Sequence, residues 1–372
     1  MSLPFIPIAN PRIGEEEARA VYDVVKSGWI SMGKKVQEFE RMACDYTGAK
    51  HALAMNNGTS TLHAILSALD IGPGDEVIVP SLTYISSANV VLYLGATPVL
   101  CENDPATFNV APEHIRAKVT PRTKAFMTVD MKGLPVDFDA FNALSEETGA
   151  AFVSDSAESY GAIYKGRKVG AQALVHSFSF FANKNITTGE GGMVTTNDDA
   201  LYEKLAIVRN QGQEGRYNHT RLGHNYRMTD VLAAIGIEQF KRLDAILDEK
   251  VALAARYTAA FAETDHVAAP VVPDHVDRPS WYMYSVTVDE ARRDPLIEHL
   301  AAREIDTRLS FPPIHIQPYY RERFGYEPAD YPLAWASYRS FLDIPIWAGM
   351  GEDNQDRVVT EITHFLGGAA DV

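Results

Sequence analysis

Several features that would place this sequence in a specialised class of protein are scarce or missing. The 372 residues include only two cysteines, Cys44 and Cys101, and no CxxC pair. Neither a disulfide framework nor a metal site is therefore expected. No stretch approaches the roughly 20 apolar residues that a membrane-spanning helix needs, and the N-terminal residues lack the pattern of a secretory signal. The sequence predicts a cytoplasmic protein without a membrane partner.

Positive charge is also in the minority. Lys and Arg number 34 against 49 Asp and Glu, which gives a formal net charge of -15. Nucleic-acid binding requires clustered basic side chains against the phosphates, so no nucleic-acid partner is expected. A small phosphorylated ligand is still compatible, because helix N-termini can bind it. The dinucleotide-binding pattern GxGxxG is absent after the first expected strand, which counts against a plain nucleotide-binding Rossmann module.

What the sequence does contain indicates a globular α/β protein. Hydrophobic residues make up 46% of the chain and charged residues 22%, and the length suggests two domains. Expected strands are 51–56, 76–80, 98–100, 125–129, 151–154, 175–180 and 192–196. Expected helices between and before them are 13–27, 36–48, 58–69, 85–94 and 138–147. This alternation predicts a large domain, residues 1–248, with a mainly parallel sheet flanked by helices.

The remainder of the chain predicts a smaller C-terminal α+β domain, residues 249–372. A long apolar-periodic segment from Thr229-Asp230 to Leu247 is expected to be the helix that leaves the large domain. Beyond it we expect a strand at 282–288 and helices at 252–263, 295–303 and 354–366.

The run Ser177–Gly192 (SFSFFANKNITTGEGG) carries the clearest chemical signal. It places Lys184 between an apolar strand and a glycine-rich turn, where neither a surface charge nor a helix cap is needed. Enzymes that form a Schiff base present a lysine amine inside a pocket in this way. We interpret Lys184 as the residue that carries pyridoxal 5'-phosphate (PLP).

Asp155 closes a predicted buried strand 29 residues before Lys184. Ligands bind at the carboxyl ends of the strands of a parallel sheet, so Asp155 should face the crevice. A carboxylate there can keep a pyridinium nitrogen protonated, which makes the ring an electron sink. Taken alone, Asp155 is more typical of a helix cap, and the lysine 29 residues later reverses that preference.

Other polar segments point to the same edge of the sheet. Asn56–Thr61 joins a strand to a helix and can bind an anion through free backbone amides, with ordinary N-capping as the alternative. Tyr84 follows a strand and could stack on a flat cofactor or pack in the core. The polar run Leu222–Met228 precedes the long helix and is not explained by packing. His315 is a candidate for contact with substrate, although a lone histidine is more often structural, and Tyr217 is a second candidate.

Together and in this order, these segments resemble the DegT/DnrJ/EryC1/StrS family of PLP-dependent sugar aminotransferases. The matching segments are Ser27–Ser31, Asn57–Thr59, Gly72–Pro80, Ser81–Tyr84, Phe178–Gly192 and Asn225–Met228. The resemblance covers nearly the whole chain. It implies the fold of a fold-type I aminotransferase, working as a homodimer with each active site at the subunit interface.

The resemblance also implies roles for individual residues. Lys184 would carry the cofactor and shuttle a proton, Asp155 would pair with the pyridinium nitrogen, and Tyr84 would stack on the ring. Glu158 would lie near the ring hydroxyl. Groups expected to hold the phosphate are Thr59, Ser60, Ser179 and, from the neighbouring subunit, Asn225. No metal is implied.

Within the family, the segments Trp29–Ser31, Leu82–Ile85 and Phe180–Gly192 look most similar to GDP-perosamine synthases. These enzymes use L-glutamate, which leaves as 2-oxoglutarate, to aminate C4 of a nucleotide-linked 4-keto-6-deoxy sugar. Two segments depart from the family pattern. Asp130-Met131-Lys132-Gly133 replaces the usual histidine or aspartate, Leu-Tyr-Gly, and Asp155–Ser159 has serines where alanines are usual. These departures leave the exact sugar open.

Four alternatives remain at this point. The enzyme could aminate C3 of a nucleotide-linked keto sugar, or a cyclitol ketone. It could be a sugar dehydratase, although in the 3-dehydratases that resemble this family a histidine replaces the lysine. It could bind PLP without turnover, although Asp155, Lys184 and Asn225 are all present.

Overall fold

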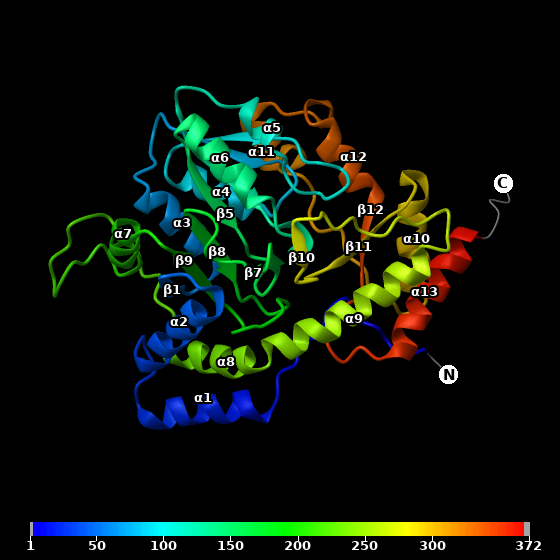
Figure 1. Ribbon diagram of the computed structural model, residues 1–372, viewed down its shortest axis with the longest axis horizontal. Coiled ribbons are helices and arrows are strands. Elements are labelled where there is room, and N and C mark those ends of the chain that lie inside the picture. The colour runs from blue at the N-terminus through cyan, green and yellow to red at the C-terminus, as the bar shows by residue number, and fades with distance from the viewer. Residues whose placement is uncertain (1–2, 368–372) are drawn as a thin grey trace.

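The structure is a computed structural model that describes residues 3–367, and it is built around a seven-stranded sheet (Figure 1). Six strands run in one direction and one, β9, runs opposite to its two neighbours. The strands in spatial order are β1 (His51–Met55), β9 (Gly192–Thr196), β8 (Val175–Ser179), β5 (Ala151–Asp155), β4 (Thr123–Val129), β2 (Glu76–Pro80) and β3 (Thr97–Cys101). The mainly parallel sheet expected from the sequence is confirmed.

Helices cover both faces of this sheet because its strands are apolar on both sides. On β4 and β5, Phe126 and Phe152 point into one core, whereas Met127 and Val153 point into the other. The first core also contains side chains of α2 (Lys34–Thr47), α6 (Phe138–Thr148) and α8 (Asp230–Lys241). The second contains side chains of α3 (Gly58–Ala68), α4 (Ser86–Tyr93) and α7 (Asp199–Arg209). Helix α1 (Glu15–Ser27) packs outside α8.

The C-terminal part has its own core. Strands β11 (Tyr284–Thr287) and β12 (Phe341–Ile344) form an antiparallel pair, packed against α9 (Leu243–Phe261), α10 (Glu290–Ala302) and α13 (Glu352–Gly367). Ile6 also lies in this core, so the chain's first described residues pack with the C-terminal part. The predicted domain boundary after residue 248 falls inside α9, a continuous helix that extends from α8 to the C-terminal helices (Figure 1).

Smaller elements complete the chain. The short strands β6 (Ile163–Tyr164), β7 (Arg167–Lys168) and β10 (Val276–Arg278) form a separate sheet. Short α-helices are α5 (Pro112–Arg116), α11 (Pro318–Phe324) and α12 (Pro332–Ser340), and 3-10 turns are η1 (Met131–Gly133), η2 (Ile314–Ile316) and η3 (Pro328–Asp330). Among residues 3–367, no helix has the length and apolar character that crossing a bilayer requires.

The structure differs from the sequence expectation in several elements, and the short elements α5, α11, α12, β6, β7 and β10 were not expected. The helix expected from Asp230 to Leu247 is interrupted at Arg242, whose ψ of 1° ends α8 before α9 begins. Helix α10 begins at Glu290 rather than 295, because the Asp289 side chain accepts a bond from the Ala291 amide and caps it. Helix α7 and strand β12 were not anticipated from the sequence.

Candidate active site

A cavity of about 670 Å³ opens at the carboxyl ends of β4, β5 and β8. This is the sheet edge at which ligands of parallel sheets bind. Seven residues singled out from the sequence line it: Thr59, Ser60, Tyr84, Asp155, Glu158, Ser179 and Lys184. The sheet thus brings together side chains that are up to 125 residues apart (184 − 59).

Lys184 lies in the loop 180–191, which joins β8 to the reversed strand β9. The loop is closed by its own backbone, since the Phe180 amide donates to the Gly191 carbonyl at 2.8 Å and the Thr188 amide donates to the Phe180 carbonyl at 3.0 Å. A side chain at Gly192 would come within 2.7 Å of the Asn57 carbonyl oxygen. Glycine at that position therefore lets the end of the lysine loop lie against the start of α3.

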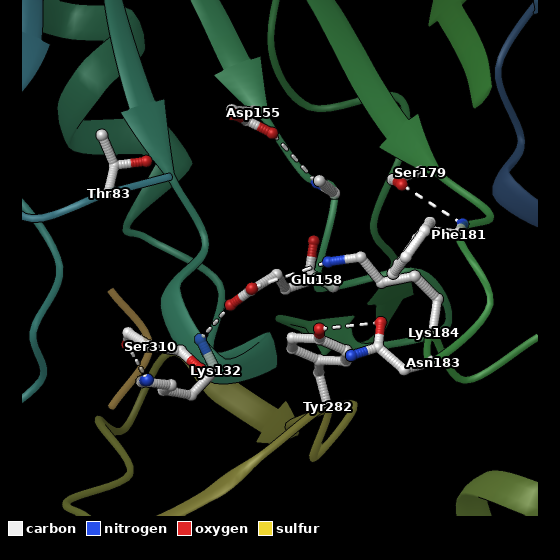
Figure 2. A network of polar contacts seen from close by, with 12 residues as sticks. Thr83, Lys132, Asp155, Glu158, Ser179, Phe181, Asn183, Lys184, Tyr282 and Ser310 are labelled. Atoms are coloured by element: carbon white, nitrogen blue, oxygen red, sulfur yellow. Dashed lines mark hydrogen bonds and ion pairs between the residues drawn. The ribbon is translucent and has the colours of Figure 1, made fainter. Parts of the chain in front are cut away.

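The amine of Lys184 is enclosed by protein groups. Its Nζ lies 3.6 Å from Glu158 Oε1 and 3.9 Å from the centre of the Tyr282 ring (Figure 2). Burial lowers the pKa of Lys184, although the charges of Glu158 and Asp155 oppose that shift. A lysine with a lowered pKa has a larger fraction of the free amine, which is the nucleophilic form.

Asp155 is the last residue of β5 and is only 4% exposed. Its carboxylate accepts the Ser87 hydroxyl at 2.9 Å, and Ser87 in turn lies 3.0 Å from the Thr83 hydroxyl. Burial raises the pKa of Asp155 to about 6, against the opposing effect of the Ser87 bond. Asp155 also accepts the Ala157 amide at 3.3 Å, as a helix cap would, but the chain forms a turn there and not a helix. The Asp155 carboxyl therefore lines the cavity in a buried position, where a cationic partner would stabilise its ionised form.

Glu158 is held in place from the side opposite Lys184. Its Oε2 accepts the backbone amide of Lys132 at 2.7 Å, as Figure 2 shows, while Oε1 faces the lysine. Glu158 is therefore fixed between β4's end and the lysine loop.

The start of α3 forms an anion-binding corner of the cavity. Asn57 caps the helix, because its side chain accepts the Ser60 amide at 2.8 Å. The first amides of a helix have no partner within it and point outward with the positive end of the helix dipole. A side chain at Gly58 would come within 3.0 Å of Ser179 Cβ, so that only glycine allows this close approach of the helix to β8. Thr59, Ser60 and Ser179 add hydroxyl groups around the corner.

Three predicted residues do not line this cavity within the single chain. His315 is buried, with Nδ1 2.7 Å from the Ser81 hydroxyl and its ring against Tyr331, and burial lowers its pKa to about 4. Tyr217 is 77% exposed on the loop that projects beyond α7 (Figure 1). Asn225 is exposed, and its backbone bridges to Asn210.

Other cavity residues were not singled out from the sequence. Tyr282 supplies a ring under Lys184, and Asn183 Oδ1 accepts the Tyr282 hydroxyl at 3.1 Å. Residues 308–311 form the wall contributed by the C-terminal part, where the Phe311 ring lies 5.1 Å from that of Tyr84. The aromatic and arginine side chains in this wall carried no local motif, and only the three-dimensional fold brings them to the sheet edge.

These features fit PLP. The corner at α3 suits a phosphate, the buried Asp155 suits a protonated ring nitrogen, and the buried amine of Lys184 lines the same cavity. Within residues 3–367 no cluster of three or more metal-ligating side chains is present.

Comparison with known proteins agrees with this geometry. The model of the DegT/DnrJ/EryC1/StrS aminotransferase family matches residues 11–363. The chain is 42% identical to GDP-perosamine synthase of Caulobacter vibrioides, covering 98% of this chain and 99% of that protein. It is 38% identical to the spore coat polysaccharide biosynthesis protein SpsC of Bacillus subtilis, covering 98% of each.

Solved structures match over the same length. The crystal structure of S. venezuelae DesV has a TM-score of 0.93 at 34% identity and covers 98% of this chain and 99% of its own. The PLP form of the putative sugar aminotransferase Spr1654 from Streptococcus pneumoniae has a TM-score of 0.92 at 29% identity, covering 99% of each chain.

Fold and site together are those of a PLP-dependent aminotransferase of fold-type I. The chain belongs to the DegT/DnrJ/EryC1/StrS aminotransferase family, and its cofactor is pyridoxal 5'-phosphate. It is an enzyme that transfers an amino group to or from a sugar.

Proposed function

We propose that this enzyme transfers the amino group of L-glutamate to C4 of a nucleotide-linked 4-keto-6-deoxy sugar, as a GDP-perosamine synthase does. The observation that carries the proposal is the 42% identity with GDP-perosamine synthase of Caulobacter vibrioides over almost the full length of both chains. The lysine at position 184 supports amination rather than dehydration, since the related 3-dehydratases have histidine there.

The residues of the site can be given roles in this reaction. PLP, when bound, supplies an electron sink next to the carbon that loses its proton. Lys184 Nζ would hold the cofactor, and its free amine would move the proton. Asp155 would keep the ring nitrogen protonated. Glu158 lies next to the amine, where its charge opposes the lowering of the Lys184 pKa by burial.

The remaining residues bind and orient. Thr59, Ser60 and Ser179 surround the corner at α3 and would hold the phosphate. Tyr84, whose ring is supported by Phe311, would stack on the cofactor ring. The wall 308–311, on the same cavity, would be available to contact the substrate.

We further propose that two copies of the chain form a homodimer, in which Asn225 reaches the partner's phosphate corner. In support, Asn225 is exposed and stands outside its own chain's cavity. Large apolar side chains at the end of α1 and just after it are also exposed, including Trp29 at 63% and Ile30 at 55%. Such a concentration of exposed apolar groups is typical of an interface.

A panel of keto sugars tests the substrate. The purified enzyme is incubated with L-glutamate and GDP-, UDP- or dTDP-linked 4-keto-6-deoxy sugars, their 3-keto isomers, and a cyclitol ketone. The expected result is one aminated sugar, with the amine at C4 by NMR, and equimolar 2-oxoglutarate. Lys184→Ala should abolish turnover. Amination at C3 or of the cyclitol would replace the proposal, and bound PLP without any product would favour a protein without turnover.

Complementation tests the shared site. Lys184→Ala and Asn225→Ala are co-expressed, and each is also measured alone. If Asn225 acts in the partner's site, each mixed dimer has one intact site, and random pairing restores about a quarter of wild-type activity. If Asn225 acts within its own chain, the mixture shows no more activity than the average of the two single variants.

A further inference from the structure

A second buried lysine lies behind the Lys184 loop. Lys250, on α9, is only 5% exposed, and its Nζ donates to Asn185 Oδ1 at 2.7 Å and to the Tyr282 carbonyl at 3.2 Å. Both acceptors are neutral, and within the described part of the chain Lys250 forms no salt bridge. Burying an ammonium group without a counter-ion costs stability, so this position calls for another explanation.

Both groups that Lys250 binds belong to residues next to Lys184, one in sequence and one in space. Asn185 is the next residue in the lysine loop, and its Nδ2 donates to the Ser280 carbonyl at 2.8 Å. Tyr282 supplies the ring that lies 3.9 Å from Lys184 Nζ. Lys250 is therefore the point at which α9, the lysine loop and the segment 280–282 are joined. Figure 2 shows the Tyr282 ring of that segment next to the Lys184 side chain.

The two lysines are also neighbours electrostatically. Both line one small cavity of about 30 Å³, which shares Asn183 and Lys184 with the main cavity. Burial, together with the charge of Lys184, lowers the pKa of Lys250 to about 7. The other charged groups nearby are Arg12, which is paired with Glu249, and, across Lys184, Glu158 and Asp155.

We propose that Lys250 is a positioning residue for Lys184, which fixes the loop that carries the amine and the tyrosine that lies against it, and sets, through its own charge, how tightly the Lys184 nitrogen holds a proton. The inference rests on the proposed role of Lys184 as the residue that carries the cofactor. Like charges oppose each other's protonation, so a protonated Lys250 favours loss of the proton from Lys184.

The pH dependence of the visible absorbance of the bound cofactor reports the protonation of the Lys184 nitrogen and tests the proposal. Lys250→Gln keeps a hydrogen-bond donor and removes the charge, so we expect the pKa of the Lys184 nitrogen to rise by about one unit. Lys250→Arg keeps the charge at all pH values, and the pKa should stay at or below the wild-type value. Lys241→Met, on the surface of α8, serves as a control and should leave the titration unchanged.

A second variant separates geometry from charge. Lys250→Met removes both hydrogen bonds, so it should show the same rise in pKa as Lys250→Gln and, in addition, a lower rate of the glutamate half-reaction, by roughly tenfold. If either neutral variant binds PLP and titrates like wild type, the proposal is wrong. If either variant fails to fold, Lys250→Arg decides, because a raised pKa in that variant contradicts the proposal.

Failure of the underlying role of Lys184 would look different. In that case borohydride reduction of the wild-type enzyme with PLP would leave no cofactor mass on the Lys184 peptide. Failure of the Lys250 inference alone would leave that mass in place and the titration unshifted.

Discussion

At the carboxyl edge of the sheet, two neighbouring strands each lead into a buried aspartate. Asp155 is the last residue of β5, and Asp130 follows directly after β4. The backbones of these strand ends are joined, since the Asp130 amide donates to the Asp155 carbonyl at 3.1 Å. Burial raises the pKa of both carboxyls, to about 6 for Asp155 and about 7 for Asp130.

The two strand ends differ in what surrounds them. Asp130 is sealed in, where it accepts the Ser159 hydroxyl at 2.5 Å and the Val136 amide at 3.1 Å. Two residues later, the buried Lys132 pairs with Asp343 of β12 at 2.9 Å and donates to the Ser310 carbonyl. Asp155, by contrast, faces the cavity with Lys184 nearby. The carboxylate at the end of β5 is thus available for chemistry because a cavity lies next to it. The strand end of β4 is instead enclosed, and the residues there hold neighbouring segments together.

The largest effect that would test this comparison is expected from Asp155→Asn. Loss of the charge that keeps the ring nitrogen protonated should lower the transamination rate on the order of 10³-fold. The free energy of unfolding near pH 7 should not fall, because the change removes a buried charge. Steady-state kinetics and urea denaturation measure the two effects. An active Asp155→Asn enzyme would remove the distinction between the two aspartates.

Lys132→Met should act on stability instead. It leaves the Asp343 carboxylate buried without its cation, which should cost about 3–5 kcal/mol in the free energy of unfolding. The double variant with Asp343→Asn should recover part of this loss, since the unpaired charge is gone while Ser285 keeps a hydrogen-bond acceptor. Urea denaturation of the three variants measures both steps. Equal free energies of unfolding for wild type and Lys132→Met would show that the Lys132–Asp343 pair does not stabilise the fold.

The pH dependence of the free energy of unfolding should show which of the two aspartates the cofactor can reach. Both have folded-state pKa values above the ordinary 3.8, so between about pH 4 and 6 or 7 the folded protein holds more protons than the unfolded chain. The free energy of unfolding of the apoprotein should therefore fall as pH rises through this window. Asp155→Asn and Asp130→Asn should each make this decrease in the free energy of unfolding smaller. PLP should remove only the contribution of Asp155 to the decrease. If PLP changes the pH dependence of Asp155→Asn as much as that of wild type, this expectation is wrong.

The smallest effect is expected from Asp130→Asn. The amide keeps an acceptor for Ser159 or Val136, so activity should stay within about threefold of wild type and stability within about 1 kcal/mol. The same kinetic and denaturation measurements apply. A loss comparable to that of Asp155→Asn would place Asp130 in the catalytic machinery.

Much of the cofactor half of the site could be predicted from the sequence. Lys184 and Asp155 stand at strand ends with turn-forming or polar residues after them, and these local signals lie within one stretch of chain. The seven strands were likewise visible, because each is a short apolar run between turn signals. The family pattern then indicated which of the polar residues to combine.

The substrate half could not be predicted in this way. Tyr282 and the wall 308–311 reach the cavity from about 100 residues beyond Lys184, and nothing in their own neighbourhood marks them. Helix α7 did have a signal, since Asp198 caps it and Leu201 and Leu205 lie one turn apart on its buried face. The break at Arg242 had none, because that residue is an ordinary helix former.

The register in which β8 pairs with β5 fixes the position of Lys184. β8 is in register with β5, with Ser177 opposite Asp155, and the buried Phe178 and the following buried Phe180 lie in one core. A shift of β8 by a single residue would turn the side chain of Phe178 to the opposite face of the sheet. It would also carry the lysine loop along the sheet by about 3.3 Å. Hydrophobic packing therefore disfavours the shifted register during folding. Phe178 and Phe180, which do not contact the reactants, in this way fix the position of the Lys184 amine.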